Sequence, residues 1–297
     1  MKKKVIIATS LIAFAIIIAL ILSIGFSTYQ YINNPTAFTN NKAFVPTDTT
    51  EVIVLGTLHQ HGAQVSFDSL YNALEKIKPN VILFEMDSTG FDETMNLKNS
   101  IYSMVAPEFL SKWQPKNLEE MACKKYQHFN PSAVIRPYEW SGRDKFHKTK
   151  AYTAIEAKCF PEMHQLYHSK KLRVQHENIF RAFLSLTQQL NGYSDSTLAQ
   201  INTKAVDSLA KSRQYLHYKA IKQIVDSNEN LKDYKAYFQP YSSYWETRNN
   251  EMVKNICRYI KLNPGSRIVV LNGYFHRYFL LEKLRLQQAA LNFKVVE

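Results

Sequence analysis

The sequence predicts an α/β protein with a mostly parallel central sheet, flanking helices and a helical insertion, preceded by an N-terminal transmembrane helix. Residues 5–26 are apolar and include no charged side chain. Short apolar runs at 52–55, 81–84 and 268–271 are typical of buried strands. A helical pattern between the first two runs makes a βαβ unit, which favours a parallel sheet.

The composition of the chain limits its class. Its 297 residues are 45% hydrophobic, which is enough to fill a folded core. The formal net charge of +12 is spread thinly and comes with no zinc-finger or RNA-binding signature, so we expect no nucleic-acid partner. Cys123, Cys159 and Cys257 lack metal-site spacing and are expected to be buried thiols, although a bridge between Cys123 and Cys159 stays open.

The N-terminal apolar run has the length of a membrane span. As a helix, residues 5–26 would cross about 30 Å of hydrocarbon. The lysines at 2–4 keep the N-terminus in the cytoplasm by the positive-inside rule. An uncleaved signal anchor is favoured over a cleaved signal peptide, whose apolar region is shorter. We therefore expect a cytoplasmic stub at residues 1–4 and a tether at 27–50. Residues 51–297 are expected to form a periplasmic or cell-surface domain.

The first strand and the helix after it lead to the second strand. Ser66 is the expected N-cap of this helix, whose apolar face repeats at helical spacing as far as Ile77. Pro79 and Asn80 separate it from the second strand. Such a crossover makes the two strands parallel, so their carboxyl ends share one edge of the sheet. In open α/β sheets this edge binds ligands.

The middle of the chain is richer in helical patterns. Short helices are indicated near 101–110 and 118–129, and a further strand at 133–140. Residues from about 150 to 240 are polar and largely helical in pattern. We expect them to form a cap over the sheet edge, because clefts between a sheet and a cap often bind ligands.

The C-terminal module repeats the arrangement of the first strand. A helix capped by Ser242 and Ser243 is expected to end at residues 263–265, where proline and glycine follow asparagine. The strand at 267–271 comes next, then a helix over about 277–288. Residues 293–296 are expected to form an edge strand.

Two histidines and a glutamate follow three of the predicted strands. His59 and His276 each come after an apolar strand and a glycine, and Glu85 directly continues the second strand. Arg248 lies on the apolar stripe of its helix, where a charge is costly unless it is paired or faces a site. These four residues at one edge predict a catalytic site. The structural alternative is a Glu85–Arg248 salt bridge that joins two segments.

Other polar residues carry weaker signals. The roles of His61, Glu139 and Asp144 stay open. His164 and His168 have the i, i+4 spacing of a metal pair, but no glutamate lies between them, and a solvated helix face is the favoured interpretation.

The motifs GTLH, KPNVILFEMD, ETRNNEMVKNI and VVLNGYFH, in this order, resemble those of the TraB/Tiki-like families, which are related to the erythromycin-esterase and ChaN-like families. Two departures are visible. No arginine follows Asp87, and Thr57 stands where the erythromycin-esterase pattern has a glutamate, so the resemblance leans toward the TraB/Tiki side. The shared positions are Gly56, His59, Glu85, Arg248, Asn249, Gly273 and His276.

The resemblance implies a membrane-anchored hydrolase that acts outside the cytoplasm on an amide, peptide or ester bond of a peptide or small molecule. In a metal-dependent version His59, Glu85 and His276 hold a divalent ion that activates water. In a metal-free version His59 or Glu85 is the general base. Arg248 stabilises the oxyanion in both.

Two other functions stay open. The first is a non-enzymatic haem or small-ligand binder, because ChaN-like members bind haem through tyrosine. The second is a membrane-tethered interaction protein whose basic helical insertion docks a partner.

Overall fold

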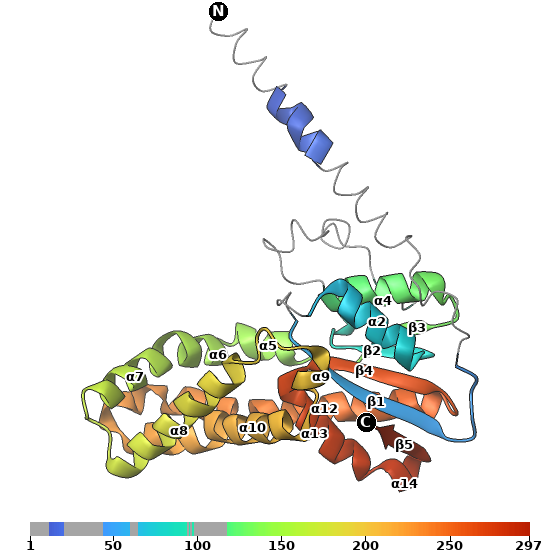
Figure 1. Ribbon diagram of the computed structural model, residues 1–297. Coiled ribbons are helices and arrows are strands. Elements are labelled where there is room, and N and C mark those ends of the chain that lie inside the picture. The colour runs from blue at the N-terminus through green and yellow to red at the C-terminus, as the bar shows by residue number, and fades with distance from the viewer. Residues whose placement is uncertain (1–11, 21–43, 60–64, 94, 96, 98–117) are drawn as a thin grey trace, which may run out of the picture.

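The computed structural model describes residues 12–20, 44–59, 65–93, 95, 97 and 118–297 (Figure 1). The predicted α/β class is confirmed. A five-stranded sheet has the order β3-β2-β4-β1-β5, and each neighbouring pair runs parallel. The strands are β1 (Thr50–Thr57), β2 (Val81–Phe84), β3 (Val134–Pro137), β4 (Arg267–Gly273) and β5 (Phe293–Val296).

The C-terminal strand β4 lies at the centre of the sheet. It pairs with both β1 and β2, which are therefore not neighbours. Ile268 to Leu271 are apolar and buried, as expected of a parallel strand covered on both faces. Because all the strands are parallel, the carboxyl ends of β1, β2 and β4 share one edge, as the sequence predicts. The predicted edge strand is β5, which pairs with β1.

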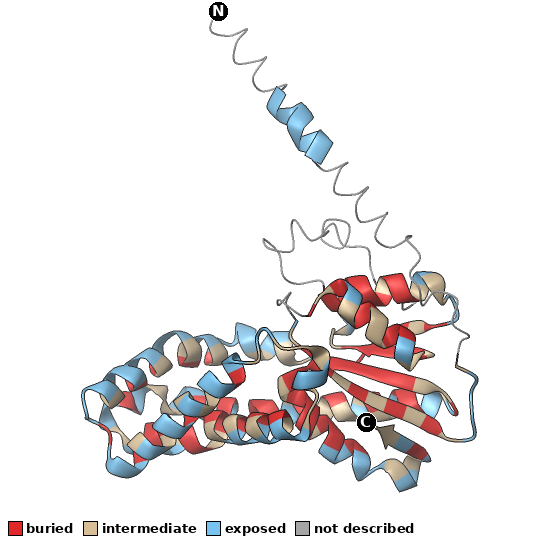
Figure 2. Ribbon diagram, in the orientation of Figure 1, coloured by how far each residue is buried: buried red, intermediate tan, exposed pale blue. Residues whose placement is uncertain are grey.

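Helices cover both faces of the sheet, and the strands between them are largely buried (Figure 2). Helices α2 (Phe67–Ile77) and α4 (Leu118–Phe129) pack on one face. Ser66 caps α2 in a capping box, as predicted. The second half of α12 (Lys235–Leu262) and α13 (Tyr274–Arg285) pack on the other face.

Helices alone connect β3 to β4, and they extend to one side of the sheet as a cap (Figure 1). The cap encloses a separate apolar cluster that includes Phe180, Ile221 and Phe238. The first half of α12 belongs to this cluster, so one helix joins the cap to the sheet layer. The other helices are α5 (Arg143–Lys148), α6 (Ala151–Ala154), η3 (Ile155–Cys159), α7 (Phe160–His168), α8 (Val174–Asn191), α9 (Leu198–Ile201), α10 (Lys204–Tyr215), η4 (Leu216–Ala220), α11 (Ile221–Ser227) and η5 (Glu229–Tyr234). Short turns η1 (Ser88–Gly90) and α14 (Gln288–Leu291) lie in the sheet layer.

Two helix starts differ from the sequence prediction. Helix α12 begins at Lys235 and not at Ser242. The hydroxyls of Ser242 and Ser243 donate to carbonyls three residues earlier, at 3.0 Å each, so they bond inside the helix and do not cap it. Helix α13 begins at Tyr274, directly after β4, which places His276 in its first turn and not in a loop.

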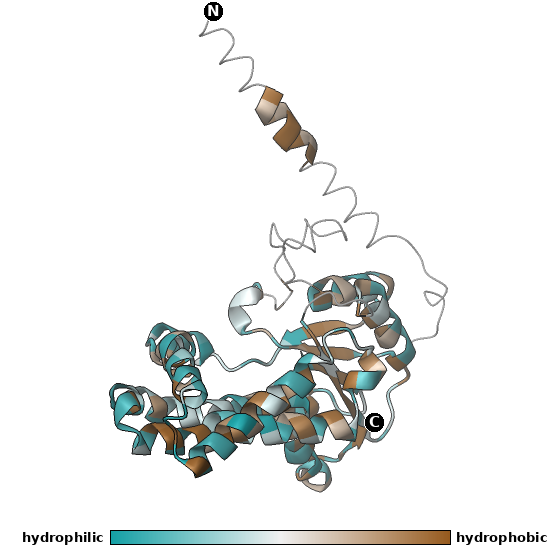
Figure 3. Ribbon diagram, turned by 60° about the vertical axis from the view of Figure 1, so that its left-hand side comes forward, coloured by the Kyte–Doolittle hydropathy of each residue, from teal (hydrophilic) through white to brown (hydrophobic). Residues whose placement is uncertain are grey.

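The predicted membrane anchor is described only in part. Residues 12–20 are helical and largely apolar (Figure 3), and they are exposed (Figure 2). Within the described ranges no helix is both long enough and apolar enough to cross a membrane. The rest of residues 5–26, like the predicted helix at 101–110, lies outside those ranges. The end of the predicted tether contacts the domain, since Thr47 N donates to Gly265 O at 2.9 Å.

Candidate functional site

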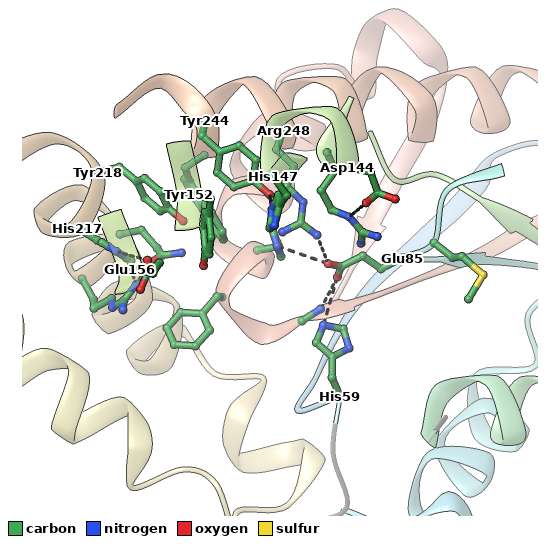
Figure 4. A pocket seen from close by; sticks show the side chains of 18 of the residues that line it. His59, Glu85, Asp144, His147, Tyr152, Glu156, His217, Tyr218, Tyr244 and Arg248 are labelled. Atoms are coloured by element: carbon green, nitrogen blue, oxygen red, sulfur yellow. Dashed lines mark hydrogen bonds and ion pairs between the residues drawn. The ribbon is translucent and has the colours of Figure 1, made fainter. Parts of the chain in front are cut away.

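The four predicted catalytic residues meet at the carboxyl edge of the sheet. Figure 4 shows His59 and Arg248 directed at the carboxylate of Glu85. Arg248 Nη2 donates to Glu85 Oε1 at 2.6 Å. His59 Nε2 lies 3.6 Å from Oε2, and His276 Nε2 lies 3.5 Å from Oε1. The side chains of His59, Arg248 and His276 are therefore grouped around one carboxylate. A protein that only docks a partner would not need this grouping.

Glu85 is held from two sides. It continues β2, and its side chain is only 5% exposed. The backbone N–H of Gly273, at the end of β4, donates to Oε2 at 2.6 Å. Arg248 holds the other oxygen. The carboxylate is thus fixed by the pairing of β2 with β4 and by α12.

Arg248 pairs with two buried carboxylates, those of Glu85 and Glu139. The sequence predicts only Glu85 as its partner. Its Nε donates to both oxygens of Glu139 at 3.1 Å, and Nη2 bonds the same carboxylate. The Glu139 side chain is fully buried, and Arg143 lies 3.6 Å from it. The structural salt bridge and the functional cluster are therefore one arrangement. Asp144 pairs with Arg143 at 3.2 Å and is 56% exposed.

Sequence reasoning missed Glu119, which orients His59. Glu119 lies in the first turn of α4, and its Oε1 is 2.8 Å from His59 Nδ1. The hydroxyl of Thr57 donates to the same oxygen at 2.5 Å. The side chain of His59 is 49% exposed, so it loses only part of its hydration; this loss opposes protonation, but the carboxylates of Glu119 and Glu85 outweigh it and raise the pKa of His59 to about 9. His59 is therefore a cation at neutral pH.

The backbone at His59 is also unusual. Its φ is +56°, a left-handed conformation that costs a non-glycine residue of order 1–3 kcal/mol and clusters at functional sites. The ring packs against Gly273, where an added Cβ would lie 2.5 Å from Nε2. The glycine that ends β4 thus leaves the space that the His59 ring occupies.

His276, in contrast to the protonated His59, is neutral. Asn249 Nδ2 donates to the Trp245 carbonyl at 2.7 Å, which leaves Oδ1 to accept from His276 Nδ1 at 2.7 Å. The proton is therefore on Nδ1, and Nε2 has a free lone pair toward Glu85. Burial, together with the charge of Arg248, lowers the pKa of His276 well below its usual 6.5. The Trp245 ring stacks on the imidazole at a centroid distance of 4.2 Å.

The predicted metal set does not fit this arrangement. No group of three His, Cys, Asp or Glu side chains in the described part of the chain is placed to hold a metal ion. Both oxygens of Glu85 accept hydrogen bonds, from Arg248 and from the Gly273 N–H. An ion on His59, Glu85 and His276 would require Glu85 to turn away from Arg248 or Gly273.

A cleft of about 920 Å³ leads from this cluster into the cap. That volume is at the upper end of the range for ligand pockets. Aromatic side chains make up much of its wall, and the polar ones lie mainly at its two ends. The aromatic lining residues are Phe84, Tyr152, Tyr218, Tyr244, Trp245 and Phe275.

The other residues that the sequence singles out, where the structure describes them, do not belong to the cluster. His61 falls outside the described residues. His164 and His168 are exposed on α7, as the solvated-face interpretation predicts. Cys123 and Cys159 are buried free thiols in different apolar clusters, and Cys257 is partly buried.

Comparison of the chain with protein-family models, with curated proteins and with solved structures finds no match. The TraB/Tiki-like resemblance therefore stays a prediction from the motifs.

Proposed function

We propose that the sheet-edge cluster hydrolyses an amide, peptide or ester bond, with His276 as general base and His59 as general acid. The observation that carries the proposal is the different bonding of two histidines at one carboxylate: Asn249 holds the proton of His276 on Nδ1 and leaves Nε2 bare, whereas His59 lies between Glu119 and Glu85. Burial keeps His276 neutral, whereas Glu119 and Glu85 keep His59 protonated. Surroundings that push two pKa values apart are how enzymes obtain an acid and a base at one pH.

The reaction begins with a water molecule between His276 and the carbonyl carbon of the substrate. As its oxygen attacks, one of its protons passes to Nε2 of His276. The carbonyl oxygen becomes an oxyanion, which Arg248 stabilises through Nη1, the nitrogen not used by Glu85 or Glu139. The bond to the leaving group then breaks, and Nε2–H of His59 protonates the departing nitrogen or oxygen. Transfer of the extra proton from His276 to His59 restores both rings.

Residues 5–26 place this site at a membrane in our proposal. The described part of that run exposes Ile12, Phe14 and Leu20, each half or more exposed, which favours a lipid environment. With the N-terminus in the cytoplasm, the domain lies in the periplasm or at the cell surface. Protease added to intact cells or spheroplasts would digest it there, and complete protection would contradict this topology.

A hydrolysis panel tests the chemistry. The purified full chain is assayed with fluorogenic peptide amides and acyl esters, with His276→Ala, His59→Ala and the control His128→Ala, an exposed histidine on α4. Loss of a general acid or base lowers kcat/KM by about 10²–10⁴-fold. We expect such a loss in the first two variants and none in the control. Wild-type turnover in His276→Ala or His59→Ala would contradict the proposal.

A second candidate function is haem or small-ligand binding without catalysis. It is favoured by the size of the cleft and by the tyrosines in its wall, Tyr152, Tyr218 and Tyr244. A Soret band on haem addition that is lost in Tyr152→Phe or Tyr244→Phe, with no hydrolysis of any panel member, would support it.

A further inference from the structure

The cleft has a second polar cluster, located in the cap. Figure 4 shows His217 and Glu156 at one end of the pocket and His59 and Glu85 at the other, with Tyr152 and Tyr244 between them. Arg213 also lines the cap end. Among the described residues, no hydrogen bond or ion pair joins these side chains to the sheet-edge cluster, so their arrangement needs its own explanation.

Two π-helical turns present this cluster. Glu156 belongs to η3, and His217 belongs to η4. A π turn adds one residue to a turn of a helix, so the regular i→i+4 hydrogen bonds are interrupted and a side chain is displaced. Such turns occur often at functional sites. Both π turns deliver a residue that lines the same cleft.

A chain of hydrogen bonds runs in one direction through the cluster. Arg213 Nη1 donates to Nδ1 of His217, because arginine can only donate. The ring proton is then on Nε2, which lies 2.6 Å from the Tyr241 hydroxyl. Tyr241 in turn donates to Glu156 Oε1 at 2.6 Å. Burial lowers the pKa of His217 to about 4, in agreement with a neutral ring. Each donor in this chain has an acceptor in the next residue, and Arg213 is the residue at which the chain begins.

Arg213 itself forms no ion pair with any carboxylate in the part of the chain that the structure describes, and Glu156 acts on it only at longer range. Its guanidinium lies over the rings of Phe183 and Phe275, at 5.0 and 5.6 Å from their centroids. Its other hydrogen bonds go to the neutral side chains of Gln214, at 2.6 Å, and Thr187, at 3.4 Å. Nη2 has no partner among the described residues. Burial lowers the pKa of Arg213, and the nearby Glu156 offsets this only in part, so a bound anion would stabilise the charge further.

We propose that Arg213 binds an anionic group, a carboxylate or phosphate, on a substrate that extends along the cleft to the sheet-edge cluster. The planar guanidinium suits either group, since it donates two parallel hydrogen bonds to a pair of oxygens. The aromatic side chains between the two ends suit an apolar portion of the same molecule. His217, Tyr241 and Glu156 are positioning residues for Arg213. That the bound molecule is a substrate rests on the proposed function, whereas anion binding by Arg213 does not.

Binding of small aromatic anions to the full chain tests this site without turnover. Benzoate and phenyl phosphate are titrated by calorimetry, with benzyl alcohol as the uncharged analogue, which distinguishes carboxylate from phosphate. We expect at least one anion to bind more tightly than the alcohol, and Arg213→Gln to weaken it by about tenfold or more. Arg181→Gln, on the exposed face of α8, is the matched control and should leave the affinity unchanged.

Three outcomes would overturn the proposal: no anion binding by the wild type, equal binding of benzyl alcohol, or unchanged anion affinity in Arg213→Gln. If Arg213→Gln does not fold, Arg213→Lys is used in its place, because it keeps the charge and removes the two parallel donors of the guanidinium. It should bind the preferred anion several-fold more weakly than the wild type, and wild-type affinity in this variant would likewise count against Arg213. The separate hydrolysis panel decides the proposed reaction, so either result can fail alone.

Discussion

Nε2 of His276 lies 3.5 Å from Oε1 of Glu85, and both atoms are hydrogen-bond acceptors. Two acceptors that face each other attract a proton donor between them. A water molecule beside the pair, within hydrogen-bond distance of both atoms, would donate one proton to His276 and the other to Glu85, in line with the base role proposed for His276. The relationship depends on Asn249, which fixes the proton of His276 on Nδ1.

Replacing Glu119 by Gln tests the charge of His59. We expect the pKa of His59 to fall from about 9, because the nearer of its two carboxylates is lost. NMR titration of the His59 ring measures it. Glu120→Gln is the matched control, since the neighbouring Glu120 pairs with Lys124 and not with His59. An unchanged His59 pKa in Glu119→Gln would contradict the assignment.

The same pKa predicts how stability depends on pH. His59 titrates at about 9 in the folded chain against 6.5 normally, so its folded-state pKa is raised. Its contribution to the free energy of unfolding is therefore complete below pH 6.5 and is lost as pH rises through 9. Because the ring is 49% exposed, solvent screens part of this effect. Urea denaturation between pH 6 and pH 10 should show a flatter decline in His59→Asn than in the wild type. Identical slopes would argue against a charged His59.

Gly273→Ala should disturb His59 and little else. The added Cβ would lie 2.5 Å from His59 Nε2, while the backbone of Gly273, at φ −56° and ψ 131°, suits alanine. The N–H that holds Glu85 is kept. We expect kcat/KM to fall by about 10- to 100-fold, as a misplaced catalytic group does, with stability within about 1 kcal/mol. Full activity would mean that the position of His59 does not matter.

Arg248→Met should strongly destabilise the fold. It leaves Glu139, with a fully buried side chain, and Glu85, at 5% exposure, without their cation. Removal of one partner of a buried ion pair costs about 3–5 kcal/mol. Urea denaturation measures the loss, and the triple variant with Glu85→Gln and Glu139→Gln should recover much of it. No recovery would show that the arginine stabilises the fold by packing.

Metal content decides between the two versions of the reaction that the sequence leaves open. The geometry favours the metal-free version, so we expect elemental analysis of the purified full chain to find no stoichiometric divalent ion, and hydrolysis to survive prolonged treatment with a chelator. Loss of activity on chelation that a single added metal restores would instead support an ion on His59, Glu85 and His276.

The sequence predicts the core of the site because strand ends can be recognised. His59, Glu85 and His276 follow apolar runs, and parallel pairing brings such ends to one edge wherever each strand lies in the sheet. The central position of β4 was not needed for that inference. Arg248 could be found because a charge interrupts an apolar helical stripe.

Glu119 and the cap cluster could not be found in this way. Helix α4 is predicted with its observed bounds, but the packing of its first turn against His59 is a tertiary contact with no local pattern. Glu156 and His217 reach the cleft through π turns, which shift the helical register by one residue and leave no periodic signal. Helix α13 begins three residues early because β4 runs directly into it.

The central claim is that His276 is neutral while His59 is protonated. Nitrogen-15 NMR of histidine-labelled protein at pH 7 reports the protonation of each ring nitrogen. We predict a proton on Nδ1 and a bare Nε2 in His276, and protons on both nitrogens of His59, with the signals assigned by His276→Gln and His59→Asn. A doubly protonated His276, or a neutral His59, would contradict the assignment of base and acid.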